Sequence, residues 1–273
     1  MLSYSHRYHA GNFADLHKHM ALLAILSHFH KKPTPFCVLD AYAGEGLYDL
    51  ESLEIQRNKE YLQGYEKYGK IEKNAMPAVF MPKLNLIAEF YQNQRNIRSV
   101  YPGSPGIIAQ HLRAQDRGIF TELHPQAYLA LNSNLGRASL YSRENIYVYK
   151  QEALAAMNSF LPFKEGRGLI FIDPSYEVKA EYLSVASSIK KNYPKFSQGV
   201  YVIWYPILAA GHHHHLIASV LELQHQKIKP VFWQSEWVPD PAVSQGLIGS
   251  GLLVINPPFQ LSEMMHPLPS QNI

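Results

Sequence analysis

The stretch Phe36-Cys37-Val38-Leu39-Asp40-Ala41-Tyr42-Ala43-Gly44-Glu45-Gly46 decides the fold of this 273-residue chain. Its apolar beginning predicts a short buried strand that ends at Asp40. Gly44 and Gly46 follow at the carboxyl end of that strand. Doubly wound α/β sheets bind ligands at this place, because the chain turns sharply there and a ligand must lie against bare backbone.

Short apolar runs recur after this strand and alternate with segments of helical periodicity, such as 154–161 and 182–191. Before the strand, apolar residues recur every three or four positions over 13–29, which predicts an amphipathic helix. This alternation predicts βαβ units and therefore a doubly wound, mainly parallel sheet with helices on both faces. The further predicted strands are 118–123, 145–149, 168–172, 199–205, 231–233 and 252–255.

One interval is too long for a simple βα repeat. About 80 residues separate the first two predicted strands, where such a repeat needs roughly 30. Residues 50–98 are charged, rich in tyrosine and broken by Pro77 and Pro82. We therefore expect a small helical subdomain at 50–98, inserted into a domain formed by 1–49 and 99–273.

The composition excludes several protein classes. A single cysteine excludes an internal disulfide framework and Cys-rich zinc sites. The longest purely apolar run, 20–26, is far shorter than the roughly 20 residues that span a bilayer. No apolar signal core precedes a cleavage site, so we expect a cytoplasmic protein without membrane contact. With 25 Lys+Arg and 22 Asp+Glu, the net charge of +3 permits a nucleic-acid partner but does not argue for one.

Acidic residues at the ends of three successive predicted strands favour a nucleoside without pyrophosphate. The dinucleotide fingerprint requires a third glycine where this chain has Asp49. Pyrophosphate would be repelled there, whereas the positively charged S-adenosylmethionine would tolerate Asp40 and Glu45. Glu122 can bind both ribose hydroxyls, and Glu152 can meet the adenine amino group. Taken alone, Glu122 or Glu152 is more often an ordinary solvated loop carboxylate, and only the three acidic strand ends in order make the pattern more specific.

The fourth predicted strand ends in Asp173-Pro174-Ser175-Tyr176, a pattern that suits methyl transfer to an exocyclic amine. The lone pair of such an amine is delocalised into the base, so the Asp173 carboxylate and the Pro174 carbonyl would help by accepting its hydrogens. Tyr176 offers a face on which an extruded base can stack. A plain Asp-Pro turn that closes a strand is the alternative interpretation.

A second tetrapeptide, Asn256-Pro257-Pro258-Phe259, fits the amino-methyltransferase pattern better by letter. It follows the last predicted strand, far from the glycine loop, whereas Asp173 follows the fourth. We therefore predict that Asp173 carries the chemistry and that Asn256 does not.

Short blocks in conserved order along the chain carry a resemblance to a known family. They are Met1-Leu2-Ser3-Tyr4, His9-Ala10-Gly11-Asn12, Ala14-Asp15, Lys18-His19, Leu39-Asp40, Ala43-Gly44, Tyr101-Pro102-Gly103-Ser104-Pro105, Thr121-Glu122-Leu123-His124-Pro125, Asp173-Pro174, Trp204-Tyr205-Pro206 and Ile255-Asn256-Pro257-Pro258. Together these blocks resemble the bacterial 23S ribosomal RNA adenine-N6-methyltransferase J family.

The resemblance implies a class I methyltransferase (Rossmann-like) fold with S-adenosylmethionine as donor and one adenine of 23S ribosomal RNA as acceptor. We expect a monomer that acts on protein-free RNA or on an early assembly intermediate. Asp173 matches the catalytic acid–base position, and Tyr4 and Lys18 match a segment next to donor and RNA. With the loop residues and Asp173 included, the expected donor site is His19, Asp40, Tyr42, Gly44, Ser104, Glu122, Gln151, Glu152 and Asp173.

The chain departs from the family pattern at four places. Ser175 replaces a second proline, Tyr42 replaces a common histidine, and Glu152-Ala153 replaces Asp-Gly. The chain also stops at Ile273, short of a final strand that we expect. These departures leave open a second reading, a catalytically weak RNA-binding relative.

The 14 histidines raise a third reading, a metal-dependent hydrolase. On a helix, however, His17 and His19 point about 200° apart and cannot share one ion, so we expect no metal site. We interpret 212–215, four consecutive histidines, as a solvated loop. Trp204 and Tyr205 either line an RNA pocket or belong to the core.

If RNA is the substrate, the modest net charge requires basic residues to be local. The candidate phosphate contacts are Arg7, Lys18, Lys31, Lys32, Lys190 and Lys191.

Overall fold

A single eight-stranded sheet organises the computed structural model, which describes residues 5–69, 80–136, 144–240, 242–243, 245–266 and 270–272. The strand order is β10-β8-β9-β7-β6-β1-β4-β5. The neighbours from β7 to β5 pair in parallel, whereas β9 pairs antiparallel with both β7 and β8. The doubly wound, mainly parallel sheet predicted from the sequence is therefore confirmed. The strands are β1 (Cys37–Asp40), β4 (Arg117–Thr121), β5 (Ile146–Tyr149), β6 (Gly168–Ile172), β7 (Val200–Ile207), β8 (Phe232–Trp237), β9 (Gly249–Ile255) and β10 (Ser270–Asn272).

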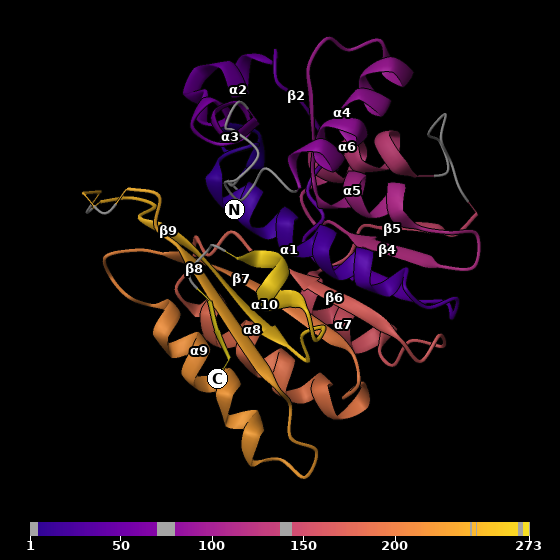
Figure 1. The fold of residues 1–273 in the computed structure, drawn as a ribbon, viewed down its shortest axis with the longest axis vertical. Coiled ribbons are helices and arrows are strands. Elements are labelled where there is room, and N and C mark those ends of the chain that lie inside the picture. Colours follow the sequence, from indigo (N-terminus) through magenta and orange to yellow (C-terminus); the bar gives the residue numbers. More distant parts are fainter. Residues whose placement is uncertain are drawn as a thin grey trace.

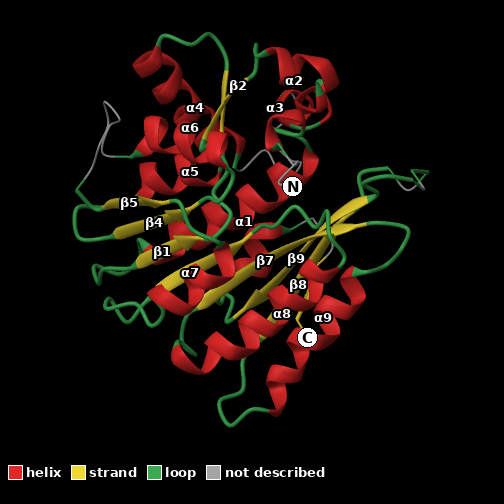
Figure 2. Cartoon of the chain, turned by 180° about the vertical axis from the view of Figure 1, so that it is seen from behind, coloured by secondary structure: helices red, strands yellow, loops and turns green. Residues whose placement is uncertain are grey.

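Helices cover both faces of this sheet (Figures 1 and 2). One face carries α1 (Phe13–Phe29), α5 (Ser104–His111), α6 (Pro125–Leu135) and the short α10 (Leu261–Met265). The other face carries α7 (Ala153–Phe160), α8 (Ala180–Asn192) and α9 (His213–Leu221). None of the helices in the described ranges has both the length and the apolar character needed to cross a membrane.

Helix α1 has the predicted bounds but is not amphipathic. All but three of its 17 residues are buried, including the polar Asp15, His17, Lys18 and His19. The helix packs against α5, α10 and β9, so no side of it is left as a broad solvated face. The prediction of an amphipathic helix is therefore wrong, and polar residues of α1 lie in the interior.

The long interval between β1 and β4 contains helices and a small second sheet. Strands β2 (Leu47–Asp49) and β3 (Val100–Pro102) pair antiparallel and frame this interval. Each is three residues long, too short to give a strand pattern in the sequence. Between them lie α2 (Leu53–Asn58), η2 (Glu60–Gln63), α3 (Tyr65–Gly69) and α4 (Met81–Arg95). The exact division of the chain into 1–49 with 99–273 and an inserted 50–98 stays a prediction.

The carboxyl-terminal part of the sheet corrects the expectation that a final strand is missing. β9 lies between β7 and β8, and β10 pairs with the outer side of β8. Ser270–Asn272 is polar and only three residues long, so periodicity could not reveal it as a strand.

The tetrapeptide 256–259 forms a turn beside the amino-terminal end of β7, away from the carboxyl ends of the parallel strands. Because β9 runs antiparallel to β7, its end lies beside the start of β7. There the Asn256 side-chain amide donates to the carbonyl oxygens of Ser197 and Gly199, at 2.8 Å each. This supports the prediction that Asn256 has a structural role.

Candidate functional site

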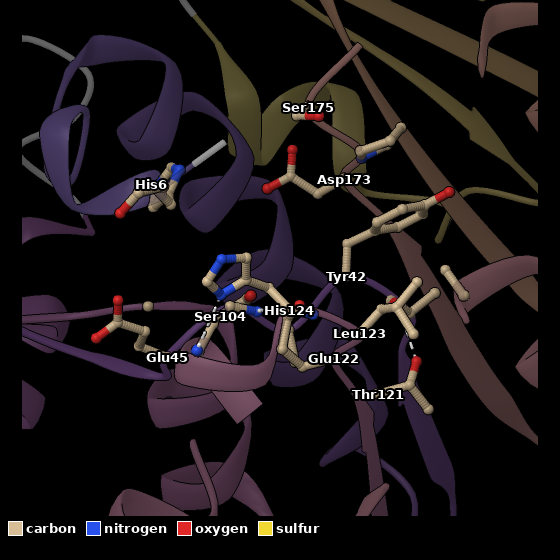
Figure 3. A pocket seen from close by; sticks show the side chains of 18 of the residues that line it. His6, Tyr42, Glu45, Ser104, Thr121, Glu122, Leu123, His124, Asp173 and Ser175 are labelled. Atoms are coloured by element: carbon tan, nitrogen blue, oxygen red, sulfur yellow. Dashed lines mark hydrogen bonds between the residues drawn. The ribbon is translucent and has the colours of Figure 1, made fainter. Parts of the chain in front are cut away.

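A pocket of about 590 Å³ lies where the carboxyl ends of β1, β4, β5, β6 and β7 meet (Figure 3). The loops after β1, β4, β5 and β6 and Trp204 within β7 contribute to its wall, and η1 (His6–Tyr8), α1 and α5 complete it. The predicted residues that line it are Lys18, His19, Tyr42, Gly44, Ser104, Glu122, Gln151, Glu152, Asp173 and Pro174. Tyr4 lies outside the described residues. The sequence thus predicted the place of the pocket and part of its wall.

The glycine loop takes a shape that requires glycine. Gly44 has a φ of +61°, and a Cβ atom there would lie 2.5 Å from the hydroxyl oxygen of Tyr48. Its backbone amide donates to Oε2 of Glu122 at 2.9 Å. The turn after β1 is therefore bonded directly to the acidic end of β4.

Glu122 presents a carboxylate whose position is fixed. Besides Gly44, the backbone amide of His124 donates to Oε1 at 2.7 Å. Burial raises the pKa of Glu122, while these amide bonds oppose the rise. Each carboxylate oxygen has a further lone pair, so the group can still accept hydrogen bonds from vicinal hydroxyls in the pocket.

Glu152 has a structural task that the sequence analysis did not foresee. Its carboxylate caps α7 by accepting from the backbone amides of Leu154 at 2.9 Å and Ala155 at 2.7 Å. Glu152 also lies on the pocket wall, so a contact with an adenine amino group stays a prediction.

Two of the predicted donor-site residues, Asp40 and His19, are deeply buried. Asp40 is fully buried at the end of β1 and is not part of the pocket wall, which corrects its expected direct contact. Burial raises its pKa to about 7, and the neighbouring Ser104 hydroxyl and Tyr42 backbone oppose this rise only in part. His19 is buried with Nδ1 2.7 Å from the hydroxyl oxygen of Tyr101. Burial lowers its pKa to about 3, so this imidazole is neutral.

Asp173, at the end of β6, forms an ion pair with Lys18 of α1. Lys18 Nζ lies 2.6 Å from Asp173 Oδ2, and the same nitrogen lies 3.0 Å from Asp15 Oδ1. Burial raises the pKa of Asp173, while the Lys18 ammonium opposes the rise. Asp15 in turn accepts from the backbone amide of Gly11 and contacts Nε2 of His6 at 2.9 Å. The sequence did not reveal this network, because Lys18 and Asp173 are 155 positions apart in the chain.

Tyr176 does not offer its ring to the pocket. The side chain is 6% exposed, and its ring stacks on Tyr182 with centroids 4.2 Å apart. Its hydroxyl donates to the carbonyl oxygen of Trp204 at 2.9 Å. The predicted stacking of a target base on Tyr176 is therefore corrected: the ring is enclosed by aromatic neighbours, and it supports β7.

Several candidate phosphate contacts are engaged within the protein. Arg7 is bonded to Glu45 at 2.6 Å and to Glu54 at 3.1 Å. Lys18 is buried, and Lys190 pairs with Glu222 at 3.0 Å. These three cations are neutralised locally and are poor candidates for phosphate contacts.

In the described part of the chain, no group of three or more His, Cys, Asp or Glu side chains is arranged so that it could hold a metal ion. His17 and His19 have separate partners. The stretch 212–215 is not a solvated loop throughout, because His213 begins α9, is 4% exposed and stacks on Tyr205.

Comparisons with known proteins give one consistent family. The family model described as "Ribosomal RNA large subunit methyltransferase D, RlmJ" matches residues 33–270. A curated protein of Escherichia coli (strain K12), named Ribosomal RNA large subunit methyltransferase J, is 35% identical over 266 residues, covering 97% of this chain and 91% of the relative. The Haemophilus influenzae protein of the same name is 34% identical over 265 residues, with 97% and 90% covered. A crystal structure of a Legionella pneumophila protein matches with a TM-score of 0.77 at 32% identity, covering 97% of each chain.

Proposed function

Because the chain belongs to the RlmJ family of ribosomal RNA large subunit methyltransferases, we propose that it methylates N6 of one adenine in 23S ribosomal RNA with S-adenosylmethionine as donor. The family and the sheet show a methyltransferase with a class I fold. The adenine, its N6 atom and the residue roles are our proposal.

The pocket fits the proposed donor. Its volume of about 590 Å³ lies within the 300–1,000 Å³ common for small-molecule sites. Gly44 leaves the backbone bare beside it, and Glu122 holds a carboxylate where ribose hydroxyls can donate. S-adenosylmethionine, when bound, supplies a methyl group on a positively charged sulfur. His19, Ser104 and Gln151 line the same pocket and would complete its binding.

The pairing of Asp173 with Lys18 is the observation that carries the acceptor chemistry. A neighbouring ammonium favours the ionised carboxylate, which accepts a hydrogen bond but donates none. In our proposal Asp173 and the carbonyl oxygen of Pro174 accept the two hydrogens of the adenine amine. This leaves the nitrogen lone pair free to point toward the methyl group. Asp173 then receives the proton that the amine loses once it is methylated.

The test is incubation of the purified protein with radiolabelled S-adenosylmethionine and protein-free 23S RNA. Label is expected in N6-methyladenine with the wild-type chain. Asp173→Ala should lower the rate by about 100-fold or more, because it removes the acceptor of the amine hydrogens. Asn256→Ala serves as the matched control and should leave the rate unchanged.

Binding of S-adenosylhomocysteine, followed by calorimetry, separates loss of chemistry from loss of the pocket. If the wild-type chain binds this product and 23S RNA but transfers no label, the alternative of an RNA-binding relative without activity replaces our proposal. If Asn256→Ala abolishes transfer and Asp173→Ala does not, the acceptor site lies at the turn after β9, and our assignment of Asp173 is wrong.

A further inference from the structure

A line of buried polar contacts runs from the middle of the sheet to the pocket wall. His17 of α1 has Nδ1 2.9 Å from Oγ of Ser250 on β9 and Nε2 3.1 Å from Oγ of Ser235 on β8. The indole nitrogen of Trp204 on β7 donates to the same Ser250 oxygen at 2.9 Å. His17, Ser235 and Ser250 are at most 1% exposed, whereas Trp204 is 8% exposed and reaches the pocket.

The donors and acceptors of this line can all be satisfied together. An indole N–H can only donate, so the Ser250 oxygen accepts from Trp204. The two ring nitrogens of His17 hydrogen-bond the hydroxyls of Ser250 and Ser235, one as donor and the other as acceptor. Burial lowers the pKa of His17 to about 3, so this imidazole stays neutral and keeps one donor and one acceptor.

At the pocket, the oriented indole meets Lys18. The Lys18 ammonium lies 4.7 Å from the centroid of the Trp204 ring, close enough for a cation–π interaction. The same ammonium contacts Asp173 at 2.6 Å. A lysine side chain has four flexible carbons, so a fixed ring face restricts where its charge can lie. The backbone of Trp204 is also held, through the hydroxyl of Tyr176.

We propose that Trp204, Ser250 and His17 are positioning residues of the methyl transfer, which fix the indole face that holds the Lys18 ammonium against Asp173. This role rests on the proposed function of Asp173 as acceptor of the amine hydrogens. The three residues act through Lys18 and are not catalytic residues themselves. We call the set of Trp204, Ser250, His17 and Ser235 the indole relay.

The charges around Asp173 predict what loosening the indole relay does. The groups that act on this carboxylate are Lys18 and Asp15 of α1, His6 of η1, Asp40 of β1, and the hydroxyls of Tyr42 and Tyr176. Lys18 is the cation in direct contact with it. Displacement of Lys18 therefore removes the main force that opposes burial, and the pKa of Asp173 should rise.

The experiment compares Trp204→Phe and Ser250→Ala with Trp233→Phe as the matched control. Trp233 of β8 is 1% exposed, and its indole nitrogen has no hydrogen-bond partner among the described residues. The control therefore removes a buried indole from the same sheet without removing a hydrogen bond of the relay. The Asp173 pKa is measured by ¹³C NMR of carboxyl-labelled aspartate in the free protein, with Asp173→Asn to assign the signal.

We expect an upward shift of about 0.5 pH unit in both relay variants and none in the control. The double variant should shift no further than the larger single one, because both break the same hydrogen bond. The acidic limb of the pH–rate profile should move in the same direction. Ser250→Thr, which keeps the hydroxyl, should restore the wild-type value.

The proposed role of the indole relay is overturned if the Asp173 pKa is unchanged in Trp204→Phe and Ser250→Ala. It is also overturned if Trp233→Phe shifts this pKa equally. If Trp204→Phe does not fold, the comparison of Ser250→Ala with Ser250→Thr decides alone. The NMR titration needs neither RNA nor donor. A wild-type chain that fails to methylate 23S RNA while both variants shift would therefore overturn the proposed function and leave the relay standing.

Discussion

Two carboxylates at the ends of adjacent strands have different environments. Asp40 ends β1 and Asp173 follows β6, and burial raises the pKa of both. Only Asp173 has the Lys18 ammonium within 2.6 Å, and only Asp173 lines the pocket. Our proposal therefore places the chemistry at the amine on Asp173, whereas Asp40 is buried outside the pocket wall.

Asp40 is expected to destabilise the fold as the pH rises. Its pKa is near 3.9 in the unfolded chain and about 7 in the folded one. Between these values the folded chain holds a proton that the unfolded chain releases, so the free energy of unfolding falls with increasing pH. Asp40→Asn should be more stable than the wild type by about 2–4 kcal/mol at pH 8 and nearly equal at pH 4. Urea unfolding at both pH values measures this difference.

Asp116 provides a control of opposite sign. Although burial alone would raise its pKa, hydrogen bonds from Arg113 and from the backbone amide of Phe36 lower it. Its contribution to stability is present above the unfolded pKa and lost as the pH falls through the folded one. Asp116→Asn should therefore be less stable than the wild type at pH 7, with a difference that becomes smaller in acid.

An effect of Asp40→Asn on stability that does not change with pH would contradict the raised pKa of Asp40.

At the scale of elements, helix ends decide how the pocket is built. α5 begins at Ser104, directly after the turn that bonds Gly103 to the glycine loop through the carbonyl of Gly46. α7 begins at Ala153 under the cap of Glu152. Both helices thus place their first residues on the pocket wall.

The cap of α7 gives a prediction for the element. Glu152→Ala should lower the free energy of unfolding by about 0.5–2 kcal/mol, because two backbone amides lose their acceptor. Gln151→Ala, one residue earlier, removes a pocket residue without removing the cap. Urea unfolding of both variants measures the cap, and calorimetry with S-adenosylhomocysteine measures the pocket. Equal stability of the two variants would contradict the capping role.

At the scale of the molecule, the short strand β10 forms one edge of the open sheet. β8 pairs with β9 on one side and with the short β10 on the other. β10 thereby covers backbone groups of β8 that would otherwise form an open edge, and open edges promote pairing between chains.

Removal of residues after His266 should therefore expose the edge of β8. We expect the shortened chain to aggregate at a lower temperature, as followed by light scattering during heating. The pocket lies at the carboxyl ends of β1, β4, β5, β6 and β7, so binding of S-adenosylhomocysteine should persist. Unchanged aggregation would show that β10 does not protect this edge.

The sequence predicted much of the fold because its signals are local. The apolar runs of β1, β4 and β6, and the glycines after β1, report strand and turn within a few residues. It missed β2, β3 and β10, each three residues long and too short for a period. It also read α1 as amphipathic, because a local pattern cannot show that other elements cover the polar side as well.

The sequence by itself therefore determined the order of strands and helices, the glycine loop and the acidic strand ends from which the donor site was predicted. The tertiary structure decided which of these groups meet. It placed Lys18 against Asp173 across 155 positions, enclosed Tyr176 among aromatic rings and buried Asp40 beneath the pocket wall. The physical reason is that burial and charge pairing depend on segments far apart in the chain, and only the packed fold brings those segments together.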